Sequence, residues 1–348
     1  MATRDNSIGF IRLLLASAVI LSHSPELIDG SPAREIGYRL TGLATTGEMA
    51  VHGFFLLSGF LIAKSYVERP SVPTFLWSRI LRIYPGFIVA SLFCLLVVAP
   101  LAGGAMDLDL LDALRWVWLE PPIAADVFAG LPYPRLNGPM WTIAYEMRCY
   151  LLVLVLGVCG LLQRRAVIAV AGVCLLVAAP HVDAPLGGRL LLLFGEPTNT
   201  VRLTGFFLVG ASFYLYREKV RYSSAGVLIA FVLLALFVRV EGLSPLAQAL
   251  AGGYLLFASA FAAAPAYITA IGRRTDISYG VYLYAYPIQN LIIYYFPGVS
   301  PWTLFPISLA LASAFGALSW FAVERPSLRL KKVLTRGASR AAPASTAW

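Results

Sequence analysis

Long apolar segments alternate with short polar ones along the whole chain of 348 residues. The first reads RLLLASAVILSH, from Arg12 to His23, and segments of similar length recur up to residue 323. A helix needs about 17–25 mostly apolar residues to cross the hydrocarbon of a bilayer. The pattern therefore predicts an all-α polytopic membrane protein with about ten transmembrane helices. We place them at 8–25, 47–66, 86–105, 139–162, 166–181, 202–217, 223–240, 245–263, 277–296 and 303–323.

Composition supports the membrane assignment and excludes several kinds of site. Hydrophobic residues make up 59% of the chain and charged residues 13%, about half the charged share of a soluble protein. The four cysteines lie in apolar segments without a Cys-x-x-Cys spacing, and there are only three histidines. We therefore expect neither a metal centre nor a disulfide framework.

The distribution of positive charge predicts the orientation, because lysine and arginine accumulate in cytoplasmic loops. With both termini in the cytoplasm, eighteen of these residues fall in inner segments and seven in outer loops. The net charge of +9 is then a signature of topology, and a nucleic-acid partner is not expected. We expect a transmembrane domain over 1–330, a basic to low-complexity cytoplasmic tail over 331–348, and a multi-pass location in the inner (plasma) membrane.

Two ionisable residues interrupt the first apolar segment. Arg12 and His23 are eleven positions apart, about three helical turns, so they share one stripe about 16 Å apart along the axis. A neutral imidazole is suited to act as a general base near pH 7. Arg12 would face an anionic group entering from the cytoplasm. The alternatives are an interfacial His23 bonded to a loop carbonyl and an Arg12 that extends to the membrane surface.

Further polar positions follow along the second and third segments. Arg79 and Arg82 share a helix face at the cytoplasmic edge, where they form either a phosphate clamp or a simple positive-inside anchor. Glu48 and His52, four residues apart near the outer end of the second segment, are expected to neighbour His23. Ser58 and the glycine after it are typical of close helix packing in membranes.

The order and spacing of these residues resemble the acyltransferase-3 family of integral membrane enzymes, which O-acylate cell-surface sugars. The resemblance covers nearly the whole chain and includes the late motif Ser278–Leu283. One departure is the pair Tyr284–Ala285, where many members have Trp-His, so that His23 must serve alone. The other matching motifs are Arg12 with His23, Phe54–Phe60 with its Ser58–Gly59, Arg79 and Arg82 with Ile83 and Pro85, Trp141-Thr142 with Glu146 and Tyr150, and Glu324 with Pro326.

The resemblance implies transfer of an acyl group, most often acetyl, from cytoplasmic acyl-CoA to a hydroxyl of a glycan. The glycan could belong to an exopolysaccharide, a lipopolysaccharide or another glycoconjugate, free or linked to lipid. His23 would be the general base, with Glu146 orienting it as a carboxylate does in a catalytic triad. The implied acetyl-CoA contacts are Arg12, Arg79, Arg82 and Ser58.

The sugar side of the implied site is built from aromatic residues and one cation. Its expected members are Trp141, Tyr150, Tyr279, Tyr282 and Arg148. Each has a structural alternative: the tyrosines could belong to an aromatic belt, and Arg148 could pair with an acidic residue on a neighbouring helix. Glu146 could likewise make only a structural bond to Tyr150 or Arg148.

Other mechanisms and functions also fit the residues. An acyl-enzyme on His23 or Ser58 is one alternative, but direct transfer is preferred because no neighbour in sequence activates Ser58. A transporter or flippase for a glycolipid or anionic solute would use Arg12, His23, Glu146 and Arg148 as a relay. The lack of an internal repeat counts against it. A purely structural role in an envelope assembly would leave the intramembrane charges without a purpose.

Overall fold

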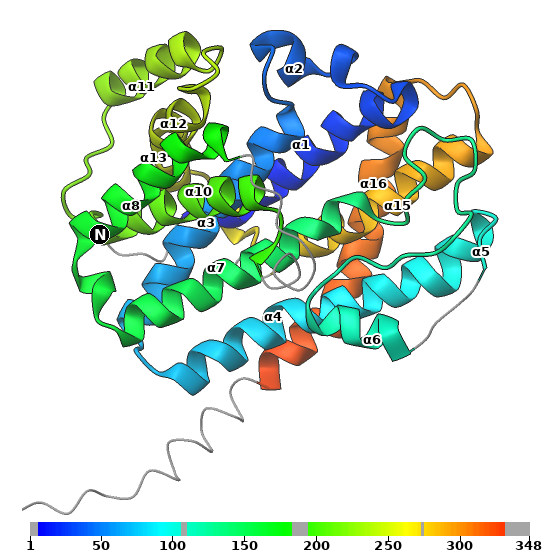
Figure 1. Ribbon diagram of the computed structural model, residues 1–348, viewed down its shortest axis with the longest axis horizontal. Coiled ribbons are helices and arrows are strands. Elements are labelled where there is room, and N and C mark those ends of the chain that lie inside the picture. Colours follow the sequence, from blue (N-terminus) through cyan, green and yellow to red (C-terminus); the bar gives the residue numbers. More distant parts are fainter. Residues whose placement is uncertain (1–5, 106–109, 183–193, 273–274, 331–348) are drawn as a thin grey trace, which may run out of the picture.

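The computed structural model is helical, which confirms the predicted all-α class (Figure 1). It describes residues 6–105, 110–182, 194–272 and 275–330. Within these ranges β-structure is limited to one isolated bridge, between Ile271 and Thr275. The tail predicted over 331–348 lies outside the described residues.

Helical segments occupy all ten of the predicted positions. The α-helices are α1 (Ile8–Asp29), α2 (Ile36–Thr41), α3 (Thr46–Glu68), α4 (Val72–Phe93), α5 (Ala99–Leu101), α6 (Leu110–Val117), α7 (Trp141–Val158), α8 (Arg165–Ala178), α10 (Pro197–Leu215), α11 (Ser224–Phe237), α12 (Ser244–Ala247), α13 (Gly253–Phe261), α14 (Ala266–Ala270), α15 (Ser278–Tyr295) and α16 (Pro301–Ser319). The short 3₁₀ and π segments are η1 (Pro32–Arg34), η2 (Cys94–Val98), η3 (Gly138–Met140), η4 (Leu161–Gln163), η5 (Ala179–His181), η6 (Gln248–Gly252) and η7 (Trp320–Glu324).

Five continuous helical stretches in the described residues are long and apolar enough to cross a membrane. They run over Ile8–Asp29, Thr46–Glu68, Val72–Leu101, Gly138–Val158 and Pro301–Leu330. A count of ten spans and the cytoplasmic position of both termini remain predictions.

The third predicted helix begins earlier than the apolar pattern indicated. The pattern placed its start at residue 86, whereas α4 begins at Val72, after the N-cap Ser71 and with Pro73 in its first turn. Arg79 and Arg82 therefore lie inside a helix that continues through η2 and α5 to Leu101. These charged side chains lower the average hydrophobicity of the stretch. Residues of neighbouring segments form ion pairs and ring contacts with them, as described below.

Helix α3 packs between α1 and α10 (Figure 1). A Cβ atom on Gly59 would lie 1.9 Å from the carbonyl oxygen of Phe207 in α10, and one on Gly210 would lie 2.0 Å from that of Leu56 in α3. The two backbones touch at these glycines, as is common where membrane helices pack through small residues. The expected packing role of the Ser58–Gly59 pair is thus confirmed for Gly59.

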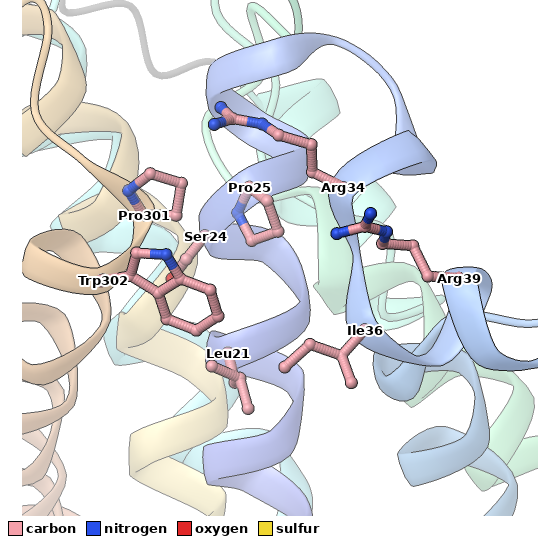
Figure 2. A pocket seen from close by; sticks show the side chains of 8 residues that line it. All are labelled: Leu21, Ser24, Pro25, Arg34, Ile36, Arg39, Pro301 and Trp302. Carbon is pink, nitrogen blue, oxygen red and sulfur yellow. The ribbon is translucent and has the colours of Figure 1, made fainter.

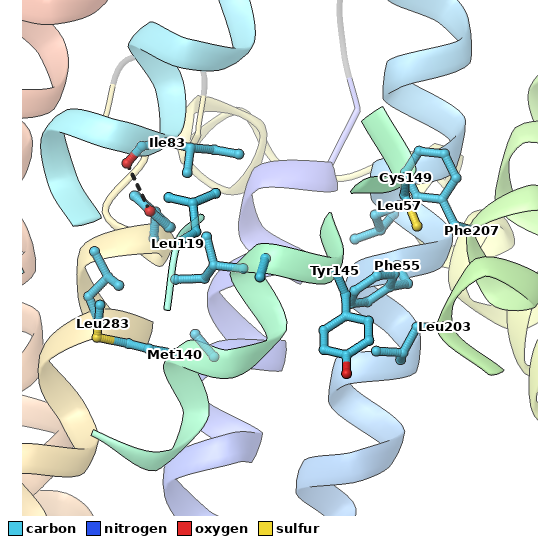
Figure 3. Close-up of a cluster of buried hydrophobic side chains, with 14 of the residues drawn as sticks. Phe55, Leu57, Ile83, Leu119, Met140, Tyr145, Cys149, Leu203, Phe207 and Leu283 are labelled. Carbon is cyan, nitrogen blue, oxygen red and sulfur yellow. Dashed lines mark hydrogen bonds between the residues drawn. The ribbon is translucent and has the colours of Figure 1, made fainter. Parts of the chain in front are cut away.

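The bundle has two ends that hold most of the predicted site residues, and a buried apolar interior joins them. The first, here called the Arg82 end, contains the start of α1, the middle of α4 and the start of α15. The second, the His23 end, contains the last turns of α1, the start of α3 and the start of α7. Figure 3 shows part of the interior, with Phe55 and Leu57 of α3, Met140 of η3 and Leu283 of α15 fully or almost fully buried.

Candidate active site

His23 lies on α1 and is half-buried at the edge of a cavity. Its Nδ1 atom is 3.1 Å from Oε2 of Glu26, one turn further along the same helix. The ring of Tyr286, from α15, meets the imidazole edge-on with 5.6 Å between the ring centroids. The hydrogen bond to the carboxylate indicates that Nδ1 carries the proton of the neutral ring. Nε2 is then the nitrogen that can accept a proton.

The cavity next to His23, here called the His23 cavity, has a volume of about 320 Å³. Its walls come from α1, α3, α7, α10, α15 and the segment before α7. They combine aromatic rings with charged and hydroxyl groups, a combination that suits a polar, ring-shaped ligand. The polar and aromatic members are His23, Glu26, Thr45, Glu48, His52, Tyr133, Arg135, Trp141, Thr142, Arg202, Tyr282 and Tyr286.

Two of the residues expected near His23 do line this cavity. Glu48 forms an ion pair with Arg202 of α10. His52 is bonded through Nδ1 to Oε1 of Gln248 at 2.8 Å and is stacked on Phe206 at 3.9 Å between centroids. Its Nε2 has no hydrogen-bond partner among the described residues. Glu48 and His52 therefore have structural partners, and His52 keeps one ring nitrogen without a bond.

Glu146 belongs to a different cluster from His23. Its Oε1 accepts a hydrogen bond from the hydroxyl of Ser58 on α3 and another from the hydroxyl of Tyr150 on α7, both at 2.6 Å. The structure thus places Glu26, and not Glu146, in hydrogen-bond contact with His23. It also gives Ser58 a carboxylate neighbour, which sequence spacing alone did not provide.

The Arg82 end is held by a network of ion pairs. Oδ2 of Asp276 accepts hydrogen bonds from Arg12 at 2.5 Å and from Arg82 at 2.6 Å. Arg82 also reaches the buried Glu324 at 3.4 Å, and Glu324 accepts a further bond from Ser319. The π segment η7 ends at Glu324, and such segments are frequent at functional sites. Carboxylates therefore balance the charges of Arg12 and Arg82.

Burial and the two guanidiniums act in opposite directions on Asp276, which precedes α15. Burial raises the pKa of its carboxyl group, and the charges of Arg12 and Arg82 lower it. Together with hydrogen bonds from Ser278, the two guanidiniums outweigh burial and hold the pKa well below its usual range. Asp276 is therefore a carboxylate at every physiological pH.

Arg79 differs from the other two arginines at this end. It donates a hydrogen bond to the hydroxyl of Ser65 at 3.3 Å and lies 5.5 Å and 5.6 Å from the ring centroids of Phe75 and Tyr150. No carboxylate pairs with it among the described residues, and its Nε has no hydrogen-bond partner there. Arg79 is therefore the arginine of this end that has no carboxylate partner among the described residues.

The expected sugar-binding residues separate into two groups. Trp141 and Tyr282 line the His23 cavity, where the Tyr282 hydroxyl lies 2.7 Å from that of Thr142. Tyr279 instead donates its hydroxyl to the carbonyl of Ile83 at 3.0 Å, a bond dashed in Figure 3. Tyr279 and Tyr150 are buried at the Arg82 end, away from the cavity.

A second cavity of about 530 Å³ adjoins the first. Arg148 lines it and lies over the ring of Tyr145, 4.8 Å from its centroid. Trp141 and Arg135 belong to the walls of both cavities. A bound ligand that extends from one cavity into the other would therefore pass these two side chains.

Sequence reasoning missed several residues of the His23 cavity. Glu26 could have been recognised, because it lies three positions after His23 on the same helix and faces the same side. Arg202 and Arg135 carry no local signal, since only tertiary folding brings them beside α1. Asp276 was missed for the same reason. Among the described residues no group of three or more His, Cys, Asp or Glu side chains is arranged to hold a metal ion.

Comparison with known proteins identifies a family and several relatives. A family model described as "Acyltransferase domain" matches residues 5–322. The O-acetyl transferase of Shigella phage Sf6 is 26% identical over 97% of this chain and 98% of its own length. Nodulation protein 10 of Rhizobium leguminosarum bv. viciae is 25% identical over 94% and 95%, respectively. Acyltransferase MdmB of Streptomyces mycarofaciens is 34% identical over only 34% of this chain and 30% of its own length. No solved structure matches the chain significantly.

Proposed function

Because the chain belongs to the acyltransferase-3 family of membrane acyltransferases, we propose that it transfers an acyl group, most often acetyl, from acyl-CoA to a hydroxyl of a cell-surface glycan. The observation that carries the proposal is the His23–Glu26 pair at the edge of an aromatic, charged cavity. The relative from phage Sf6 is named as an O-acetyl transferase, which supports a hydroxyl as the acceptor. We place the protein in the inner (plasma) membrane.

In the proposed step His23 acts as the general base. Nε2 removes the proton of a sugar hydroxyl as its oxygen attacks the thioester carbon of acyl-CoA. The carbon–sulfur bond breaks, and the proton taken by His23 passes to the departing thiolate, which leaves as the free thiol of CoA. Glu26 holds the imidazole through Nδ1 and stabilises the imidazolium that forms, the role that sequence analysis gave to Glu146.

For the acyl donor we propose entry at the Arg82 end. Arg79 would contact a CoA phosphate directly, because its guanidinium lacks a carboxylate partner among the described residues. Arg12 and Arg82, whose charges are balanced by carboxylates, would shape this end through Asp276. Ser58, bonded to Glu146, lies on α3 between this end and the cavity.

We propose that the route between the two ends opens through a conformational change. Tyr282 lines the His23 cavity and ties α15 to the start of α7, because its hydroxyl donates to the carbonyl of Pro139 at 2.8 Å and meets Thr142. The cavity wall includes none of Arg12, Arg79 and Arg82. We therefore propose that donor binding moves α15 relative to α7, so that the thioester reaches His23.

The acceptor would bind in the His23 cavity, with its chain extending past Trp141 into the second cavity. Aromatic rings such as Trp141 and Tyr286 provide apolar faces, and Glu48, Arg202 and Arg135 offer hydrogen bonds. The two cavities together accommodate an acceptor longer than one sugar ring. A glycan chain, free or lipid-linked, is therefore the acceptor class that we propose.

The test is transfer of radiolabelled acetyl from acetyl-CoA to a panel of oligosaccharides by the purified protein in detergent. We expect His23→Ala to lower kcat by roughly 10²–10⁴-fold, as for loss of a general base, with the dissociation constant of acetyl-CoA unchanged. His181→Ala is the matched control, since His181 is exposed and outside the cavity. Normal turnover by His23→Ala would refute the role of His23.

Thermal stabilisation tests the donor separately. A ligand that binds the folded state raises the unfolding temperature, so acetyl-CoA should stabilise the wild type and stabilise Arg79→Ala less. A transporter or flippase of unrelated solutes would show no stabilisation by CoA. Equal stabilisation of the wild type and Arg79→Ala would remove Arg79 from the donor site.

A further inference from the structure

Helix α1 also borders a third, smaller cavity on the side away from His23. His23 and Glu26 face the His23 cavity, whereas Leu21, Ser24 and Pro25 face a cavity of about 150 Å³ between α1, α2 and the start of α16 (Figure 2). We call it the α1–α16 pocket. Its lining residues are Leu21, Ser24, Pro25, Arg34, Ile36, Arg39, Pro301 and Trp302.

The α1–α16 pocket is polar at one end and apolar at the other. In Figure 2 the guanidinium of Arg34 lies above Pro25, at one end, while Leu21 and Ile36 lie at the opposite end. The exposed ring of Trp302 forms the wall across from Arg39. An amphiphile with an anionic head and an apolar tail matches this gradient.

The position in the fold places the pocket at a membrane boundary. The stretches Ile8–Asp29 and Pro301–Leu330 are both candidate spans, and the pocket lies where the end of one meets the beginning of the other. Tryptophan and arginine concentrate at such boundaries, where each has one apolar and one polar part. Trp302 and Ile36 are both exposed and would face lipid.

The charges at the polar end leave one cation without a partner. Arg34 makes two hydrogen bonds to the carboxylate of Asp29, one of them from Nε at 2.5 Å. The side chain of Arg39 makes no hydrogen bond or ion pair with any described residue, and only its backbone N–H is bonded, to the carbonyl of Glu35. The N-terminus of α16, which starts at Pro301, adds the positive end of a helix dipole. One carboxylate therefore faces two guanidiniums and a helix N-terminus.

A backbone acceptor lies in the same wall. Pro25 has no N–H, so the carbonyl of Leu21, one turn earlier, lacks its usual intrahelical bond. Both residues line the pocket. A head group with a hydroxyl could donate to this carbonyl while its phosphate contacts Arg39.

We propose that the α1–α16 pocket binds the phosphate-bearing head group of an anionic phospholipid. The volume equals about five water molecules at roughly 30 Å³ each, enough for a small head group but not for an oligosaccharide. The acyl chains would lie along Leu21 and Ile36. This binding does not depend on the acyl-transfer function, and it would hold α1 in place from the side opposite His23.

The experiment is native mass spectrometry of the full-length protein in detergent, titrated with phosphatidylglycerol or phosphatidylcholine. We expect the wild type to bind phosphatidylglycerol more tightly than phosphatidylcholine. Arg39→Ala should weaken phosphatidylglycerol binding about fivefold, the factor for one interfacial cation, while Arg39→Lys retains most of it. Arg115→Ala is the matched control, because Arg115 pairs with Glu120 outside the pocket and should bind as the wild type does.

A second variant and a competition arm complete the test. Trp302→Ala removes the opposite wall and should also weaken binding, which tests the pocket independently of charge. Millimolar inorganic phosphate should not displace the lipid if the head group and chains bind together. Equal affinity of the wild type and Arg39→Ala for phosphatidylglycerol, or equal affinity for both lipids, would overturn the proposal. Displacement by inorganic phosphate would overturn the lipid as the ligand.

Discussion

The carboxylate that contacts His23 is close to it in sequence, whereas the one expected from the family resemblance is not. Glu26 follows His23 by three positions and is bonded to it, while Glu146 accepts from Ser58 and Tyr150. A local rule, three positions along one helix, would have been sufficient to find the first contact, although our sequence analysis did not apply it. The second required knowledge of which helices meet, because Ser58 and Glu146 are 88 positions apart. Local pairs are thus predictable from one sequence, and contacts between helices are not.

Replacement of Glu26 by Gln should affect catalysis more than binding. The amide keeps the size of the side chain but no longer stabilises an imidazolium, so we expect kcat to fall at least about tenfold with KM little changed. The pH at which the rate reaches half its maximum should shift as well. Steady-state kinetics at several pH values measure both effects, with the exposed Glu241→Gln as control. An unchanged pH profile and kcat would contradict a positioning role.

Asp276 is expected to matter for stability in a pH-dependent manner. The pKa of Asp276 is lower in the folded protein than in the unfolded chain. Its carboxylate therefore contributes fully to the free energy of unfolding above its unfolded pKa of about 4. That contribution is lost as the pH falls below about 4. At pH 7, Asp276→Asn leaves Arg12 and Arg82 without this partner and should cost about 3–5 kcal/mol.

Thermal unfolding in detergent between pH 7 and pH 3 checks the expectation for Asp276. The difference between the wild type and Asp276→Asn should shrink towards the acid end. Asp29→Asn is the control, because its partner Arg34 is exposed and such pairs contribute about 0–1 kcal/mol. A difference that stays constant with pH, or two variants of equal stability, would show that the pairing with Asp276 contributes little.

At the scale of elements, the apolar pattern located helices well and their ends less well. All ten predicted segments contain helix, but α4 begins at Val72 rather than at residue 86. The helical turns that the pattern missed contain Arg79 and Arg82. Their charged side chains lower the average hydrophobicity, so the average does not indicate a membrane helix there. They are helical because Asp276, Glu324 and the ring of Tyr150 accommodate them inside the bundle. A pattern along the chain carries no information about such partners.

The contact between α3 and α10 should tolerate no side chain at Gly59. A methyl group there would lie 1.9 Å from a backbone oxygen of α10, so the helices must separate. We expect Gly59→Ala to destabilise the protein by about 1–3 kcal/mol or more, measured as a lower unfolding temperature in detergent. Gly242→Ala is the matched control, because a Cβ atom at Gly242 would meet nothing within 4 Å. Equal unfolding temperatures would show that α3 and α10 do not pack through Gly59.

At the scale of the whole molecule, the charge distribution predicts that the two ends of the bundle lie on opposite sides of a membrane. The Arg82 end would face the cytoplasm and the His23 end the outside. In the part of the chain that the structure describes, five stretches meet the length and hydrophobicity of a span, and the remaining apolar helices there are shorter or less apolar. The orientation follows from lysine and arginine counts, a property of the whole chain that no single helix carries.

Labelling of introduced cysteines in intact cells tests this orientation. In a background without the four natural cysteines, Arg39→Cys should react with a membrane-impermeant maleimide added outside. Lys219→Cys, an exposed position near the end of α10, should react only after the cells are opened. The reverse labelling pattern would show that the orientation is opposite to the predicted one, with His23 on the cytoplasmic side.

Trp141 lines both the His23 cavity and the second cavity, so its indole lies between them. If the side chain shrinks, as in Trp141→Ala, the two cavities merge into one larger space. Such a variant should bind the proposed glycan acceptor more weakly and should accept bulkier acceptors that the wild type excludes.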